Sequence, residues 1–297
     1  MEKLVSIVGP TGSGKSAMGV ALAKKFNGEI VSSDSRQVYA HADIGTGKIT
    51  EKEMSGIPHY CIGFIHPKTQ SSLPLWKNAA TAAITDIHKR KKLPLLVGGT
   101  AFYVYAIADG LDFPEVPPNL KLRKELDNKT LPELLIMLEG LDARRIETIQ
   151  EKNKRRIIRA IEIVKETGSI IPALAGKAPY ESLILGIERT PEEIKKAINR
   201  QQEERLQSGI LDEINSLHKK GLTWKRIAEL GLDYRYLVDV ARKKVSIEEA
   251  SGKLATALWR FTKQQMNWWK RDDRVVWVRN VEEAEKIVKK FLATPTK

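Results

Sequence analysis

A glycine-rich segment near the N-terminus has the residue types and spacing of a phosphate-binding loop. It fits G-x-x-x-x-G-K-[ST] at every fixed position, and its members are Gly9, Pro10, Thr11, Gly12, Ser13, Gly14, Lys15 and Ser16. Glycines let backbone N–H groups close around phosphate oxygens, Lys15 reaches the terminal phosphate, and Ser16 can hold Mg²⁺. A chance glycine-rich turn is the alternative. The strand-like residues 4–8 before the motif and the helical pattern of residues 16–25 after it favour the phosphate loop.

An acidic side chain near this loop would decide what happens to the bound phosphate. A nucleotide hydrolase needs an apolar strand that ends in an acid, yet residues 93–97 end in Gly98, Gly99 and Thr100. Asp34 follows the strand-like residues 29–33, so it is expected at the carboxyl end of a strand, where open α/β sheets bind ligands. Capping of the next turn is an equally good role for Asp34. The chain therefore should bind a di- or triphosphate without the usual equipment for hydrolysing it.

Two further loops carry polar or glycine-rich sequence beside the predicted site. Residues 34–39 and 43–48 gather many polar groups without an amphipathic pattern, which is typical of a functional loop. Residues 98–100 resemble a second loop built for close approach, and an ordinary strand-to-helix turn is the alternative.

Two basic segments differ from an average charged surface. Residues 152–159 contain no acid, and Arg155, Arg156 and Arg159 can share one helical face. Residues 259–279 interleave tryptophans with lysines and arginines, a mixture that suits looped RNA. For these tryptophans, packing in the core is the better interpretation, whereas the arginine cluster favours RNA binding.

Element patterns predict an α/β fold: a parallel sheet of the P-loop NTPase-like kind, flanked by helices. Apolar strand-like runs alternate with helical patterns through the first hundred residues, a rhythm typical of parallel sheets with helical crossovers. After Pro114, Pro117 and Pro118 only helical periodicity is found, until strand character resumes at residues 183–187. We therefore predict a core of residues 1–119 and 178–297 and an all-helical insertion of residues 120–177.

Composition excludes several classes of protein. The 297 residues are 42% hydrophobic and 29% charged, the balance of a globular chain and not of a disordered one. Apolar runs are too short to cross a membrane, and the start of the chain has no secretory signal, so a cytoplasmic protein is expected. The single cysteine, Cys61, excludes an intrachain disulfide and a thiolate zinc site. The net charge of +13 suggests an anionic partner such as phosphate.

Taken in this order and spacing, the motifs resemble the tRNA dimethylallyltransferase family over almost the whole chain. The matching segments are residues 9–16, 34–39, 43–46, 58–59 and 97–100, together with Tyr103, Arg123, residues 155–162, Lys263, Gln265 and Trp268. Departures from the family pattern are Gly12, Trp76, Asn153 and Gln264. Eukaryotic members carry a C-terminal zinc finger, so a chain with one cysteine resembles the bacterial type.

The resemblance implies a reaction and the residues that perform it. A dimethylallyl group would move from dimethylallyl diphosphate to N6 of the adenosine 3′ to the anticodon, in tRNAs that read codons beginning with U, with release of diphosphate. Asp34 would act as general base, with Thr100 and Lys15 as further catalytic residues, Mg²⁺ as cofactor and residues 9–16 on the diphosphate. The tRNA-binding residues would be Asp34, Ser35, Arg36, Gln37, Thr100, Arg123, Arg155, Arg156, Ile157, Ile158 and Arg159.

Partners and rival functions follow from the same residues. The expected partners are the anticodon stem-loop of tRNA and dimethylallyl diphosphate, with no membrane, for a monomeric enzyme. One rival is a small-molecule kinase that uses the same loop on ATP, for which the insertion of residues 120–177 would imitate a lid. A second rival is an RNA-binding protein with a vestigial phosphate loop, which would show no turnover.

Overall fold

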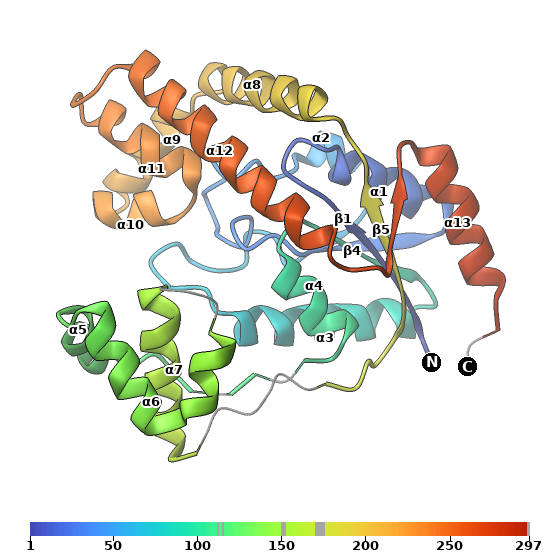
Figure 1. Cartoon of the computed structure of the whole chain (residues 1–297). Coiled ribbons are helices and arrows are strands. Elements are labelled where there is room, and N and C mark those ends of the chain that lie inside the picture. The colour runs from blue at the N-terminus through green and yellow to red at the C-terminus, as the bar shows by residue number, and fades with distance from the viewer. Residues whose placement is uncertain (112, 115, 150–152, 170–175, 296–297) are drawn as a thin grey trace. The chain divides into compact units, whose positions relative to one another are not determined.

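The computed structural model describes the chain except residues 112, 115, 150–152, 170–175 and 296–297 (Figure 1). It divides into two compact units, one of Met1–Gly110 with Ala178–Lys297 and the other of Leu111–Lys177. The second unit begins earlier than residue 120, where the sequence analysis placed the insertion, because Leu111 pairs with Gly176 in an antiparallel bridge.

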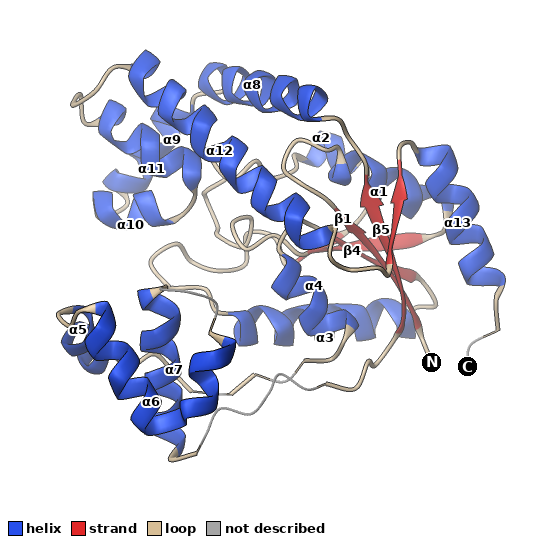
Figure 2. Ribbon diagram, viewed as in Figure 1, coloured by secondary structure: helices blue, strands red, loops and turns tan. Residues whose placement is uncertain are grey.

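The first unit is built on a parallel sheet, as the alternation of strand and helix patterns predicts. Its described residues form six strands in the order β3-β2-β4-β1-β5-β6, and every neighbouring pair is parallel (Figure 2). The chain places β2 and β4 on one side of β1 and β5 on the other, so the topological switch point lies at the end of β1. The strands are β1 (Lys3–Val8), β2 (Gly28–Ser32), β3 (His59–Tyr60), β4 (Leu93–Val97), β5 (Glu181–Ile187) and β6 (Val275–Val278).

Helices cover both faces of this sheet. One face carries α1 (Lys15–Lys25) and α13 (Val281–Ala293), which contact each other, and the other carries α3 (Leu73–Lys89) with α4 (Ala101–Ala108) (Figure 2). Trp76 of α3 is fully buried, and its indole N–H donates to the carbonyl of Ser32 at the end of β2, at 2.9 Å. The helix on each face therefore buries the side chains that alternate along the central strands.

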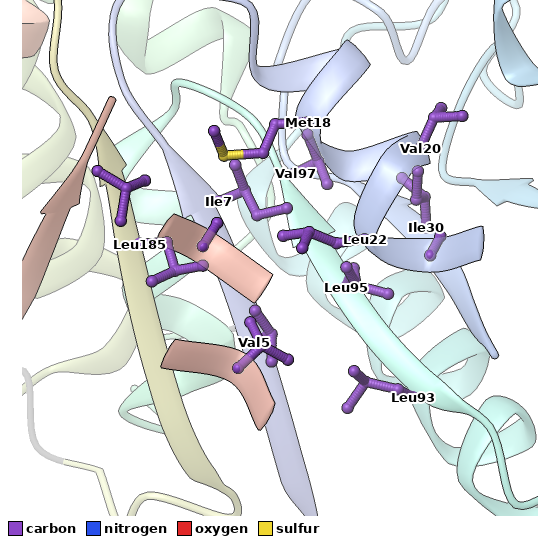
Figure 3. Packing of buried hydrophobic residues seen from close by; sticks show 14 of the residues in the cluster. Val5, Ile7, Met18, Val20, Leu22, Ile30, Leu93, Leu95, Val97 and Leu185 are labelled. Atoms are coloured by element: carbon purple, nitrogen blue, oxygen red, sulfur yellow. The ribbon is translucent and has the colours of Figure 1, made fainter. Parts of the chain in front are cut away.

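The main hydrophobic core lies between α1 and the sheet. Figure 3 shows Met18 and Leu22 of α1 against Ile7 of β1 and Leu95 of β4, and all four are almost fully buried. Such burial contributes about 25 cal/mol per Å² of apolar surface removed from water. This packing holds the start of α1, and with it the phosphate loop, against the ends of the strands.

The rest of the first unit is helical and follows β5. The helix α8 (Pro191–Gln207) begins at a Thr190 capping box. A long helix, α12 (Ile247–Trp269), contacts α4, α8 and α11. The remaining elements of this unit are α2 (Glu51–Met54), α9 (Ile210–Lys219), α10 (Trp224–Glu229) and α11 (Leu232–Ala241).

The second unit is helical in its described residues, and its centre is a buried carboxylate. It consists of α5 (Leu120–Asp127), α6 (Leu131–Thr148) and α7 (Lys154–Thr167). Glu162 of α7 is 1% exposed and receives the N–H of Asn119 at 2.6 Å and the guanidinium groups of Arg123 and Arg159. These bonds lower the pKa of Glu162 against the opposing effect of burial. The carboxylate therefore joins the start of α5 to α7.

Candidate active site

The phosphate loop connects β1 to α1 and takes its shape from three glycines. Gly9, Gly12 and Gly14 have φ angles of 148°, 80° and 92°, values that side-chain-bearing residues rarely adopt. The Nζ atom of Lys15 donates to the carbonyl oxygen of Pro10 at 2.6 Å, so the lysine lies folded over the loop. The loop thus ends at the N-terminus of α1, where backbone N–H groups and the helix dipole attract anions.

A cleft of about 900 Å³ opens beside this loop within the first unit. It is bounded by the phosphate loop, α1, the loops between residues 34 and 50, and α8. Polar and apolar side chains both line it, including Lys15, Ser16, Asp34, Gln37, Ile44, Thr46, Lys48, Ile49, Val97, Arg200 and Arg205. The cleft can therefore hold a charged phosphate group and an apolar group together.

Asp34 lies in the cleft and also stabilises the turn that follows β2. Its carboxylate accepts the backbone N–H of Arg36 at 2.8 Å, the turn-capping bond that the sequence offers as one role. The same carboxylate is close enough to Lys15 to act on its charge: burial lowers the pKa of Lys15 to about 8, and Asp34 partly opposes that fall. The capping bond uses one carboxylate oxygen, and it does not compete with a role in the cleft.

The second glycine loop, after β4, lies against the backbone that precedes Asp34. A methyl group on Gly98 would come within 2.4 Å of the carbonyl carbon of Ser33, so only glycine fits. Thr100 begins α4 at the same place, and its hydroxyl accepts the backbone N–H of Ser35 at 3.1 Å. The close approach predicted for this loop is therefore an approach to protein backbone, and it places Thr100 beside the Asp34 turn.

Ser35, Arg36 and Gln37 occupy the turn after Asp34. The Arg36 guanidinium donates to the carbonyl of Glu229 at 3.0 Å, and Gln37 donates to the carbonyl of Gly47 at 2.9 Å. Gln37 lines the cleft, whereas Arg36 is exposed. The structure thus brings the candidate residues 34–37 to the same edge of the sheet as the phosphate loop.

Gln265 of α12 links the two glycine loops. Its Oε1 atom accepts the backbone N–H of Thr11 at 2.9 Å, and its Nε2 atom donates to the carbonyl of Gly99 at 3.1 Å. The sequence reveals Gln265 only through the family resemblance, because residues so far apart in the chain carry no local signal of their contact. The long helix α12 is therefore tied directly to the phosphate loop.

Sequence reasoning missed the basic residues that α8 brings into the cleft, whereas Lys48 belongs to the loop of residues 43–48 that the sequence indicates as functional. Arg200, Arg205 and Lys48 all line the cleft. Arg205 pairs with the buried carboxylate of Asp233 at 2.7 Å, and Lys48 donates to the carbonyl of Tyr39 at 2.8 Å. The pattern of residues 191–207 predicts a helix, but it does not indicate which edge of the sheet that helix covers.

The candidate tRNA-binding residues of the second unit have different environments. Arg155 and Arg156 are exposed on the first turn of α7. Arg159 is held by Glu162 and also donates to the carbonyl of Val116 at 2.8 Å. Ile157 is fully buried and Ile158 is 4% exposed, so both side chains pack in the core of this unit and present no surface for RNA.

Arg123 is held in the same way as Arg159. Its Nε and Nη2 atoms donate to the two oxygens of Glu162, at 2.9 and 2.8 Å. Glu162 therefore fixes the orientations of both guanidinium groups, and any contact that they make with RNA starts from those orientations.

Other side chains with possible chemistry serve packing. Cys61 is buried, and burial raises the pKa of its thiol to about 12, so it is unreactive. The described residues include no group of three or more His, Cys, Asp or Glu side chains that could hold a metal ion. Among these residues there is also no helix long and apolar enough to cross a membrane.

The pKa of Lys15 predicts how substrate capture depends on pH. With a pKa of about 8, Lys15 is mostly charged at pH 7 and loses its charge as the pH rises through 8. We expect kcat/KM for a diphosphate substrate to fall over that interval, because only the ammonium form attracts the diphosphate. Measuring kcat/KM between pH 6.5 and 9.5 checks this. A flat profile up to pH 9.5 would contradict it.

A parallel sheet with a glycine-rich loop at its switch point and a carboxylate in the adjoining cleft is the architecture of α/β enzymes that bind phosphate groups. Residues 37–272 match the IPP transferase family, and residues 2–62 match isopentenyl transferases. The chain belongs to the IPP transferase family.

Relatives with the same architecture support this assignment along the whole chain. A tRNA dimethylallyltransferase from Thermoanaerobacter sp. (strain X514) is 36% identical, with 98% of each chain covered. The crystal structure of the full-length tRNA isopentenylpyrophosphate transferase from Bacillus halodurans is 33% identical and superimposes with a TM-score of 0.73, covering 99% of this chain and 96% of that one. A eukaryotic dimethylallyltransferase acting on tRNA, 23% identical, shares the fold with a TM-score of 0.85 over all of this chain and 81% of its own.

Proposed function

We propose that this enzyme transfers a dimethylallyl group from dimethylallyl diphosphate to N6 of the adenosine 3′ to the anticodon, in tRNAs that read codons beginning with U. Membership of the IPP transferase family supports the reaction class. The single observation that carries the chemistry is the cleft in which Lys15 and Asp34 lie together. A diphosphate leaving group and a proton acceptor are what a prenyl transfer to an amine requires.

The phosphate loop serves the leaving group in this proposal. When the C1–O bond of the allylic substrate breaks, negative charge grows on the diphosphate. Backbone N–H groups of residues 11–16 and the ammonium of Lys15 stabilise that charge, and Lys15 exchanges the Pro10 carbonyl for a diphosphate oxygen. Because β4 ends at Val97 and is followed by Gly98, Gly99 and Thr100, the neighbouring strand offers no acid to activate water against a phosphate.

Asp34 serves the nucleophile. As adenine N6 forms its bond to C1, one N6 proton passes to the Asp34 carboxylate, and diphosphate leaves with the electron pair of the broken C1–O bond. Thr100 supports this arrangement, because its hydroxyl holds the backbone of Ser35 next to the base. The adenine must leave the stacked anticodon loop to reach the cleft, which is base flipping.

The phosphate loop also fits a Mg²⁺ ion. Mg²⁺ keeps several waters and takes few protein ligands besides phosphate oxygens. Ser16 lines the cleft at the first turn of α1, so its hydroxyl is placed to serve as such a ligand. Bound there, Mg²⁺ would neutralise charge on the diphosphate.

The helical second unit is proposed to contact the anticodon stem-loop. Arg155 and Arg156 are exposed cations on one turn of α7, the arrangement expected for phosphate contacts. Arg123 and Arg159 would act in the orientations set by Glu162. A cytoplasmic location and a monomeric state stay predictions.

Incubation of the protein with unmodified tRNA, dimethylallyl diphosphate and Mg²⁺ tests the proposal directly. Nucleoside analysis should find dimethylallyl-adenosine at the position 3′ to the anticodon, with one diphosphate released for each modified tRNA. Absence of the modified nucleoside from a folded preparation that binds tRNA would favour an RNA-binding protein. Steady ATP hydrolysis without tRNA would favour the kinase alternative.

Salt dependence should separate the two kinds of arginine on α7. Replacing Arg155 and Arg156 with alanine should weaken tRNA binding and flatten the log–log salt slope by about one unit per lost phosphate contact. Titrations at several salt concentrations measure the slope. Arg159→Ala serves as the comparison, because it also removes a partner of the buried Glu162 and should lower thermal stability in addition to tRNA affinity. An unchanged slope in the Arg155/Arg156 variant would make those residues an ordinary solvated surface.

A further inference from the structure

Glu213 on α9 holds an unusual number of hydrogen-bond donors from a loop far away in the sequence. Its Oε2 atom accepts the backbone N–H groups of Asp43 and Ile44, at 2.7 and 2.8 Å. Its Oε1 atom accepts the backbone N–H of Gly45 at 3.0 Å and the hydroxyl of Tyr234 at 2.7 Å. Three successive N–H groups thus converge on one carboxylate, an arrangement that proteins use to bind anions.

A second set of contacts fixes the same loop at Gly45 and Gly47. Tyr234 is fully buried, and its ring lies so close to Gly45 that a methyl group there would come within 2.5 Å of it. Asp233, the neighbour of Tyr234 on α11, pairs with Arg205, whose guanidinium lies against Gly47. The helices α8, α9 and α11 therefore hold residues 43–47, and neither Glu213 of α9 nor Tyr234 of α11 lines the cleft.

The other side of this loop is a wall of the cleft. Ile44, Thr46 and Lys48 line the same cavity as Lys15 and Asp34. Ile44 is both a cleft residue and one whose backbone N–H is held by Glu213. A change in the Glu213 carboxylate would therefore act on the wall of the cleft, and none of its four hydrogen bonds involves the phosphate loop or Asp34.

We propose that Glu213 is a positioning residue, which fixes residues 43–48 as the wall against which dimethylallyl diphosphate is bound. This inference rests on the proposed function. Without the carboxylate, three backbone N–H groups lose their acceptor and must find water or another partner, which changes the path of the loop. A displacement of about 1 Å at a binding wall is enough to reduce catalysis severely.

Glu213→Ala and Glu213→Gln provide a graded test. We expect Glu213→Ala to raise KM for dimethylallyl diphosphate by about tenfold, the factor that corresponds to losing one to two net hydrogen bonds. Glu213→Gln keeps one acceptor oxygen, so it should raise KM by only about threefold. The affinity for tRNA, measured without the diphosphate substrate, should stay within about twofold of the wild-type value, because the loop N–H groups serve the cleft wall.

Arg226→Ala is the matched control for a role in stability alone. Arg226 also ties the C-terminal helices to a distant loop, through the carbonyls of Pro67 and Thr69 at 2.8 and 2.9 Å, and it does not line the cleft. It should lower the melting temperature and leave KM for dimethylallyl diphosphate unchanged.

The outcomes separate this inference from the function on which it rests. Wild-type protein that transfers no dimethylallyl group overturns the proposed function. If the wild type is active and Glu213→Ala keeps its KM, or resembles Arg226→Ala in losing only stability, the positioning role of Glu213 is wrong. Should Glu213→Ala fail to fold, Glu213→Gln decides: a raised KM with unchanged tRNA affinity supports the role, and an unchanged KM overturns it.

Discussion

Replacing Asp34 with asparagine should lower kcat by about 10²–10⁴-fold, the range typical of a positioned general base. Asparagine has almost the same shape, and its Oδ1 atom can still accept the N–H of Arg36 that the carboxylate now accepts at 2.8 Å. The turn after β2 should therefore survive, together with tRNA affinity and thermal stability. Single-turnover rate, tRNA affinity and melting temperature, all measured on one preparation, check this expectation.

A control carboxylate distinguishes loss of the base from loss of charge. Asp212→Asn removes an exposed carboxylate from the first turn of α9 and should leave the transfer rate unchanged. A fall in rate of less than tenfold for Asp34→Asn, accompanied by a lower melting temperature, would reduce Asp34 to a turn cap. The proton acceptor would then have to be water or another group.

Lys15→Ala should reduce prenyl transfer by about 10³-fold or more, because it removes a preorganised cation from the site where negative charge grows on the leaving group. Lys15 lies at the start of α1, folded over the phosphate loop, and the loop itself is shaped by its glycines. The variant should therefore fold normally and bind tRNA with near wild-type affinity. Rates at saturating dimethylallyl diphosphate, together with tRNA titrations, measure the two effects separately.

Lys25→Ala is the matched control on the same helix. Its ammonium pairs at 3.6 Å with Glu285 on the surface, and it does not line the cleft. Near-normal transfer by Lys15→Ala would remove the phosphate loop from the chemistry. Loss of transfer by Lys25→Ala would show that lysines on α1 matter for some reason other than diphosphate binding.

The effects of the Asp34→Asn and Lys15→Ala variants are linked through the charge on Asp34. The Asp34 carboxylate raises the pKa of Lys15, which burial lowers. A neutral residue in place of Asp34 therefore lowers the pKa of Lys15 further, in addition to removing the base. The rate of Asp34→Asn should be measured at pH 7 or below, where Lys15 keeps most of its charge.

The strand and helix pattern of the first unit was predictable because it depends on neighbours in the sequence. The apolar runs at residues 4–8 and 93–97 became β1 and β4, and the pattern of residues 191–207 became α8. Elements without a local pattern were missed. The strand β3 is two residues long and exists through its pairing with β2, and α4 is apolar on most sides and shows no helical period.

By itself, the sequence determined the phosphate loop, the parallel α/β sheet and the order of those elements that have a local pattern. Each of these depends on contiguous residues whose backbone preferences are local. The roles of Asp34 and the other site residues stay predictions. Only the tertiary structure decided which side chains enclose the cleft: Gln265 against Thr11, Glu213 against the loop at Ile44, and Arg205 from α8. Those contacts join residues more than a hundred positions apart, so they depend on how packed helices meet the sheet edge, and no local spacing encodes them.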